Sequence, residues 1–275
     1  MAKIVLAVGT SHSPGQINGF ERMSLKRLEN LHGSWRYIRN AVRSLKPDLI
    51  INISNEHHVN FYEQNMPAIC VGVGESHFGP TDGDNIRVAK GMVPGNANFA
   101  NDMMKQAYCD GFDLAWSKDL SLDHGHMIPY QFFNPEHTIP MIPIMVNTVL
   151  YPMPEPARVY QFGKFLGKFI ASRPTNERIV VVGAGGISHD VGTPRSGWID
   201  VDFDHEFLEN LEHVRADKIS GYTTEKLAKS GNGTHEIKSW VAAMGSVGDL
   251  KPRVLAYEPA EELITGTGIV VWEPA

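Results

Sequence analysis

Short apolar runs and longer stretches with helical spacing alternate along the chain. The first run covers residues 3–9 and ends in glycine, as a buried strand followed by a sharp turn does. Later runs of the same kind are short and rich in apolar, often β-branched residues, so they also predict buried strands. They lie at residues 49–53, 68–73, 141–146, 179–182, 253–257 and 268–272.

Apolar residues three or four positions apart predict helices between these strands. The longest such stretch covers residues 20–45, with Gly33 as a candidate break inside it and Pro47 as its end. Residues 74–95 are rich in Gly, Asp and Pro, which predicts a long surface loop. The other predicted helices cover residues 97–109, 157–170, 207–214, 223–229 and 235–244.

This order of strands and helices is typical of the α/β class. We expect a central, mostly parallel or mixed sheet with helices on both faces. Apolar residues make up 42% of the chain and charged residues 20%, the usual balance of a globular protein. No internal repeat, low-complexity tract or change in composition marks a linker. We therefore predict a single domain over residues 1–275.

Charge and cysteine content narrow the expected partners and compartment. The net charge is -6 and no basic stripe is present, so nucleic acid is not an expected partner. The opening apolar run is too short for a signal peptide, and no stretch reaches the length of a membrane span. Cys70 and Cys109 are the two cysteines and form no CxxC pair. These features predict a cytoplasmic protein without membrane contact.

The chain has 12 histidines, and the positions of three of them indicate a site. His12, His57 and His189 each follow the carboxyl end of a predicted strand. Open α/β sheets gather their active sites at this edge, because loops from several strands converge there. One histidine at a strand end is usually a hydrogen-bonded loop residue. The repeated occurrence beside glycines favours an active site at the strand carboxyl ends.

Two further groups complete a candidate metal site. The sequence Asp123-His124-Gly125-His126 is expected in a loop before an apolar strand, and Glu236 opens a helical segment. No cysteine lies in these groups, which disfavours structural zinc and iron–sulfur clusters. Two histidines and one carboxylate suit non-heme iron(II) and oxygen chemistry, but the same ligand types hold catalytic zinc with a bound water. The residues alone leave both metals open.

Two specific motifs and several supporting ones carry a family resemblance. The specific ones are Asp123-His124-Gly125 and Gly185-Gly186-Ile187-Ser188-His189, and the others are Thr10-Ser11-His12, Asn55-Glu56-His57, Pro152-Met153-Pro154 and His235-Glu236. In this order, over nearly the whole chain, they resemble the class III extradiol ring-cleaving dioxygenases, in particular the catalytic β subunit of protocatechuate 4,5-dioxygenase. Glu56 is a departure, since the family more often has Asp there, and the change keeps the charge.

The resemblance implies a role for each residue of the candidate site. It implies a single catalytic domain that holds Fe(II) through His12, His57 and Glu236 and uses O₂ as co-substrate. His189 is then the base that takes a proton from the catechol, because an imidazole titrates near neutral pH. His124 is the residue that hydrogen-bonds to O₂ or donates a proton during ring opening.

Residues outside this set receive lesser roles. Arg195 follows His189 closely in the sequence and is a candidate to meet a substrate carboxylate. His58 and His126 are expected to support the site without binding metal. Phe61, four positions after His57, favours His57 over His58 as the ligand.

The resemblance also implies a substrate class and partners. The expected substrate is an aromatic diol such as protocatechuate, gallate or a methylated gallate, cleaved next to the diol. Alternatives are the same chemistry on a 2-aminophenol or a hydroxypyridine, a zinc-dependent hydrolase on a related fold, and a metal-free binding protein. A homo-oligomer, with a dimer as the first expectation, and a small subunit of the α type are the protein partners that the resemblance allows.

Overall fold

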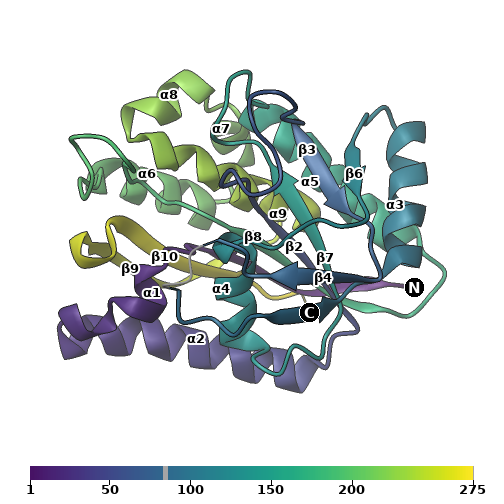
Figure 1. Cartoon of the computed structure of the whole chain (residues 1–275), viewed down its shortest axis with the longest axis horizontal. Helices are drawn as coiled ribbons and strands as arrows, with labels where there is room; N and C mark the ends of the chain where they lie inside the picture. Colours follow the sequence, from purple (N-terminus) through teal and green to yellow (C-terminus); the bar gives the residue numbers. More distant parts are fainter. Residues whose placement is uncertain (83–85, 275) are drawn as a thin grey trace.

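One large mixed sheet forms the centre of the molecule (Figure 1). The computed structural model describes residues 1–82 and 86–274. The strand order is β6-β3-β7-β2-β8-β1-β10-β9. The strands are β1 (Lys3–Thr10), β2 (Leu49–Asn55), β3 (Ile69–Gly72), β6 (Ala115–Ser117), β7 (Met141–Val146), β8 (Arg178–Ala184), β9 (Arg253–Ala260) and β10 (Thr265–Trp272).

The middle of the sheet is parallel and its edges are partly antiparallel. Strands β7, β2, β8 and β1 pair in parallel, whereas β10 pairs antiparallel with both β1 and β9. Strand β3 pairs antiparallel with β7 and parallel with β6. The central strands are almost fully buried, which explains why they are continuous apolar runs and not alternating patterns.

Helices cover both faces of the sheet, as predicted (Figure 1). Successive residues of β1 separate the two cores: Ala7 packs into one, Leu6 and Val8 into the other. The first core is closed by α3 (Ala97–Cys109), α5 (Pro156–Ser172), α6 (Val201–Glu212) and α9 (Lys238–Val247), the second by α2 (Leu25–Leu45) and α4 (His124–Phe133). The remaining short elements are α1 (Gly15–Asn18), η1 (Phe20–Arg22), α7 (Ala216–Ser220), α8 (Thr224–Lys229), η2 (Asn232–Ile237) and η3 (Glu261–Leu263).

Two predictions of secondary structure were wrong in the first half of the chain. Gly33 does not break α2, because Leu31, Trp35 and Ile38 on the same helix are buried in the core. That burial outweighs the cost of about 1 kcal/mol for a helical glycine. The predicted loop 74–95 contains a two-stranded antiparallel sheet of β4 (Ser76–Gly79) and β5 (Gly91–Pro94). Part of that loop, residues 83–85, lies outside the described residues.

The third error concerns the group 123–126, which is not a loop. Asp123 is the N-cap of α4, and its side chain accepts a hydrogen bond from the backbone N–H of His126. Residues 124–133 are therefore helical, and the predicted apolar strand follows later as β7. The cap also fixes where His124 and His126 lie, since both are in the first turn.

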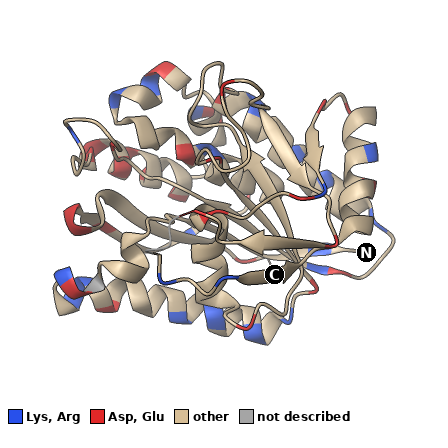
Figure 2. Cartoon of the chain, viewed as in Figure 1, with Lys and Arg blue, Asp and Glu red and all other residues tan. Residues whose placement is uncertain are grey.

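Charged residues of both signs are interspersed along the outer helices, most visibly along α2 and around α6 and α8 (Figure 2). Among the residues that the structure describes, no helix has the length and apolar character needed to span a membrane.

Candidate metal centre

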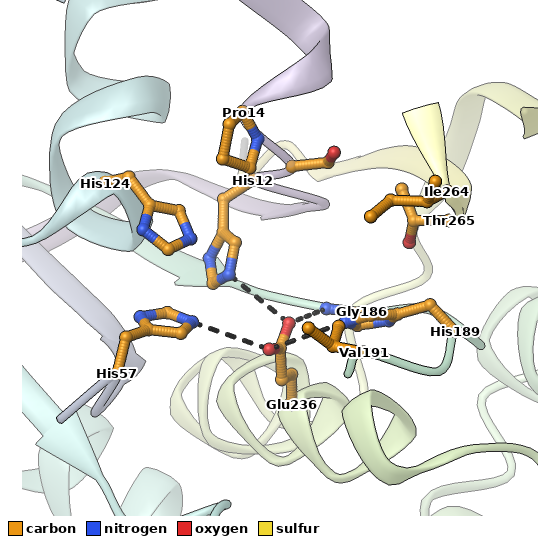
Figure 3. A pocket seen from close by; sticks show the side chains of 11 residues that line it. His12, Pro14, His57, His124, Gly186, His189, Val191, Glu236, Ile264 and Thr265 are labelled. Atoms are coloured by element: carbon orange, nitrogen blue, oxygen red, sulfur yellow. Dashed lines mark hydrogen bonds and ion pairs between the residues drawn. The ribbon is translucent and has the colours of Figure 1, made fainter. Parts of the chain in front are cut away.

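Three neighbouring parallel strands bring the predicted histidines together. His12 follows β1, His57 follows β2, and His189 lies in the loop after β8. Since β8 pairs in parallel with both β1 and β2, the three carboxyl ends lie at one edge of the sheet. All three histidines, with His124 and Glu236, line one cavity of about 230 Å³ (Figure 3). The structure therefore brings these five residues together at one cavity.

The Glu236 carboxylate lies at the centre of this group (Figure 3). Its Oε2 is 3.3 Å from His12 Nε2, and its Oε1 is 3.6 Å from His57 Nε2 and 3.6 Å from His189 Nε2. The backbone N–H of Gly186 donates to Oε2 at 2.8 Å. The carboxylate therefore faces imidazole nitrogens from three different strand ends.

Buried acceptors on the far side of each ring fix the orientation of the histidines. His57 Nδ1 donates to Asp123 Oδ2 at 2.8 Å, which leaves Nε2 free to bind a metal. Asp123 Oδ1 is 3.0 Å from His126 Nδ1, so one carboxylate contacts both His57 and His126. His12 Nδ1 is 3.4 Å from Ser54 Oγ. His58 is exposed and lines a neighbouring cavity, so His57 faces the centre.

The electrostatics favour the ligand forms of Glu236 and His12. Burial opposes the charge on Glu236, but His189 and His12 outweigh burial and hold the pKa of this carboxyl well below its usual range. Burial lowers the pKa of His12 to about 4, so its imidazole is neutral near pH 7. Burial also opposes protonation of His57, yet Asp123 and Glu236 raise its pKa well above the ordinary value. A metal at His57 Nε2 would therefore displace a proton.

His124 is the fourth histidine of the cavity. Its ring centroid is 4.2 Å from that of His57 and 5.3 Å from that of His12. One nitrogen from each of these three residues lies within 4.8 Å of the others, so they are also a group that could hold a metal. Two candidate donor sets thus share His12 and His57, one completed by Glu236 and the other by His124.

Sequence reasoning missed Asp82, which contacts His124. Its Oδ1 accepts the backbone N–H of His124 at 2.7 Å, and its Oδ2 contacts His124 Nδ1. An acidic residue in a segment rich in Gly, Asp and Pro carries no signal of such a role. The contact joins residues 42 positions apart and depends on how the β4–β5 segment folds back.

Arg195 lies apart from the centre. Its guanidinium is 2.6 Å from Asp190 Oδ2 and lies over the ring of Trp198. It lines a second cavity of about 660 Å³, which shares His57, Val191 and Glu236 with the first. A contact between Arg195 and a substrate stays a prediction, and this contact would have to be made in the second cavity.

A buried carboxylate holds the loop that carries His189. Asp204 Oδ1 accepts the backbone N–H of Ser188 at 2.9 Å, and Oδ2 accepts the hydroxyl of Tyr257 at 2.7 Å. Burial raises the pKa of Asp204 from 3.8 to about 6 in spite of these hydrogen bonds. Folding therefore favours the protonated form.

The wild type should lose stability as the pH rises and Asp204 ionises, and we expect Asp204→Asn to abolish this loss. The stabilising contribution of protonated Asp204 is complete below its unfolded pKa near 4 and is lost as the pH rises through about 6. The amide keeps an acceptor for Ser188 and does not titrate. Relative to the wild type, the free energy of unfolding of the variant should therefore rise by up to about 3 kcal/mol as the pH increases from 4 to 7. Denaturant unfolding measures this difference. Asp202→Asn, exposed on the same helix, is the control; a gain that does not change with pH would contradict the assignment.

Comparison with known proteins relates this geometry to one family. Residues 6–271 match the family described as the catalytic LigB subunit of aromatic ring-opening dioxygenase. The chain is 28% identical to a 2,3-dihydroxyphenylpropionate/2,3-dihydroxicinnamic acid 1,2-dioxygenase of Mycobacterium sp. (strain MCS), with 98% of both chains covered. An Escherichia coli (strain 55989 / EAEC) protein of the same name is 25% identical, with 94% of this chain and 95% of that protein covered.

A solved structure shares the fold. The crystal structure of an uncharacterized protein from Escherichia coli K12 superimposes with a TM-score of 0.65 and 14% sequence identity. The match covers 98% of this chain and 99% of that one. The likeness therefore extends over the whole sheet and its helices.

Proposed function

The chain belongs to the family of the catalytic LigB subunit of aromatic ring-opening dioxygenases, and from this premise we propose that it cleaves a substituted catechol with O₂ at an iron(II) ion held by His12, His57 and Glu236. The resemblance to class III extradiol dioxygenases is confirmed, and the protein is an extradiol ring-cleaving dioxygenase. The observation that carries the proposal is the convergence of these two imidazoles and one carboxylate on a buried cavity.

The donor set fits iron(II). Two imidazoles and one carboxylate that leave a face open are the ligands typical of non-heme iron(II) oxygenases. Glu236 is anionic and buried, and such a charge needs a positive partner, which a divalent cation supplies. The buried charge of Glu236 therefore favours the donor set that it completes over the set of three histidines. His124 is then free for a catalytic role.

His189 is placed to take a proton from the substrate. Iron(II), when bound, would lower the pKa of a diol hydroxyl and supply electrons for the reaction with O₂. His189 Nδ1 is 3.2 Å from the Ile187 carbonyl, which only accepts, so Nδ1 carries a proton and Nε2 faces the cavity. Burial opposes protonation of His189, and Glu236 raises its pKa above the usual value. With a cation bound at Glu236 this pull would be weaker, and Nε2 of His189 would be ready to accept a proton.

His124 is placed to act on the oxygen that attacks the ring. It lines the same cavity as His189 but comes from the first turn of α4, beside His12 and His57. Figure 3 shows His124 and His189 on different sides of the cavity. One histidine can therefore accept the substrate proton while the other donates a hydrogen bond or a proton during ring opening.

The two adjoining cavities support a substrate with a side chain. The smaller cavity, of about 230 Å³, has room for one aromatic ring, and the larger one shares His57, Val191 and Glu236 with it. We assign the diol ring to the smaller cavity and the ring substituent to the larger one. Suitable substrates are protocatechuate, gallate, a methylated gallate and, as the relatives' names suggest, 2,3-dihydroxyphenylpropionate.

A substrate panel tests this assignment. Protein loaded anaerobically with iron(II) is mixed with aerated catechol, protocatechuate, gallate, 3-O-methylgallate, 2,3-dihydroxyphenylpropionate or 2-aminophenol, and O₂ uptake is followed with absorbance scans. We expect O₂ uptake with a substituted catechol at a higher kcat/KM than with catechol itself. Equal kcat/KM for catechol and all its derivatives would contradict the placement of the substituent in the larger cavity.

The contact between Gly233 and His189 gives a further prediction. A Cβ added at Gly233 would lie 2.0 Å from His189 Nε2, and the imidazole would have to turn away. Gly233→Ala should therefore lower kcat by about 10- to 100-fold while the iron content stays unchanged. Gly91→Ala is the control, because a Cβ there meets no atom within 4 Å. Loss of iron from the Gly233 variant, or wild-type kcat, would argue against this contact.

A further inference from the structure

We propose that Asp82 is a positioning residue of the catalytic site. Its carboxylate orients the ring of His124 and determines which ring nitrogen carries the proton. Its carboxylate holds His124 at two atoms, the backbone N–H and Nδ1. Both side chains are largely buried, with 19% of Asp82 and 14% of His124 exposed. The inference rests on the proposed function for the importance of His124, but the contact itself stands on geometry.

Two carboxylates share the amino end of α4. Asp123, the N-cap, accepts the backbone N–H of His126, while Asp82 accepts that of His124, the first residue of the helix. Free N–H groups at a helix amino end favour nearby anions. Each carboxylate also holds imidazoles: Asp123 holds His57 and His126, and Asp82 holds His124. A carboxylate at the amino end of α4 thus orients each of these two rings, the proposed ligand His57 and the proposed proton donor His124.

The segment that carries Asp82 is held in place by other contacts. Thr81 donates to the Leu122 carbonyl through its backbone N–H at 2.9 Å and through its hydroxyl at 3.2 Å. The Leu122 N–H donates to the Phe78 carbonyl at 2.8 Å. A Cβ at Gly79 would lie 2.5 Å from Leu122 Cβ, which shows how closely β4 approaches. The carboxylate of Asp82 is therefore not needed to dock this segment, and a change in it tests its effect on His124.

The carboxylate determines which nitrogen of His124 carries the proton. A carboxylate accepts hydrogen bonds and does not donate them, so the nitrogen that it contacts, Nδ1, must carry hydrogen. In the neutral ring Nε2 is then an acceptor, and in the protonated ring it is a donor. The contact at Nδ1 thus fixes the orientation of the ring, with Nε2 on the side away from Asp82. Without Asp82 the neutral ring is free to place its proton on Nε2 and to turn.

Histidine NMR tests this arrangement independently of turnover. The protein is labelled with ¹⁵N-histidine and loaded with zinc(II), which is diamagnetic, and the His124 signals are assigned from their absence in His124→Phe. We expect Nδ1 of His124 to be protonated in the wild type. Asp82→Asn keeps an oxygen for the backbone N–H but presents an N–H to Nδ1. The proton of the neutral ring should therefore move to Nε2.

Kinetics of the iron(II)-loaded protein complete the test. Asp82→Asn should lower kcat by about 10- to 100-fold, as loss of a supporting partner does, with KM and iron content unchanged. Asp82→Glu should recover part of this loss. Thr81→Val removes a hydrogen bond of the same segment and should change neither the spectrum nor kcat.

The outcomes separate this inference from the proposed function. An unprotonated Nδ1 in the wild type, an unchanged spectrum in Asp82→Asn, or wild-type kcat in that variant would overturn the role of Asp82. Equal losses in Thr81→Val would show that docking of the segment, and not the carboxylate, matters. If the wild type consumed no O₂ with any catechol, the proposed function would fail, while the spectra would still decide whether Asp82 holds the proton on Nδ1.

Discussion

Glu236→Ala is expected to lose metal binding and ring cleavage together. The variant removes the only carboxylate of the proposed donor set, which faces Nε2 of both His12 and His57, whereas Asp123 still holds His57 at Nδ1. Since even loss of a partner that supports a ligand costs 10- to 100-fold in metal affinity, loss of this ligand should cost more than about 100-fold. Metal content after anaerobic loading and desalting, measured with O₂ uptake, checks both effects.

Two further variants sharpen this experiment. Glu236→Gln keeps the shape but not the charge, so it should bind iron more weakly than the wild type and more strongly than the alanine variant. Glu225→Ala changes an exposed glutamate in the first turn of α8 and should behave as the wild type. Full iron content and full activity in the alanine variant at position 236 would indicate that the metal is bound by His12, His57 and His124 instead.

His189→Phe should keep the iron and lose most of the turnover. Phenylalanine preserves a flat ring in the cavity but has no nitrogen to accept the substrate proton. The loss of a general base lowers the rate by about 100- to 10 000-fold, and we expect kcat to fall within that range. His189 is not one of the proposed ligands, so the iron content should not change. Iron analysis and steady-state O₂ uptake measure the two quantities.

The control for this variant is His213→Phe. His213 is exposed on the far end of α6, and its replacement should leave kcat unchanged. Wild-type turnover in His189→Phe would remove His189 from the mechanism. Loss of iron in that variant would instead indicate that His189 contributes to the metal site through its contact with Glu236.

The meeting of the histidines was predictable because it depends on a general property of parallel strands. Apolar runs that end before His12 and His57 predict strands, and the carboxyl ends of parallel neighbours lie at the same edge. Composition and spacing did not assign roles to these residues. Those roles came from the family resemblance, whose recognition is confirmed by the match over residues 6–271.

The sequence did not predict the start of α4, the β4–β5 sheet or the contact of Asp82 with His124. These features depend on contacts that local sequence patterns do not encode. The apolar residues after Asp123 have no clear period, and the hydrogen bonds from the N–H groups of His126 and Met127 to Asp123 show that a helix begins there. The β4–β5 sheet lies in a segment rich in Gly, Asp and Pro, where local composition indicates a loop. Asp82 contacts His124 because that segment is hydrogen-bonded to Leu122, far from it in the sequence.

Iron(II) at the His12, His57 and Glu236 site is proposed to support ring cleavage by O₂. The most direct test of this proposal is to load metal-free protein anaerobically with either iron(II) or zinc(II), add one active substrate from the panel, and measure O₂ consumption and product mass. The proposal predicts one O₂ consumed per substrate molecule, a product that contains both oxygen atoms, and activity with iron(II) alone. Zinc-loaded protein that hydrolyses esters or amides, with no O₂ uptake by the iron-loaded protein, would contradict it.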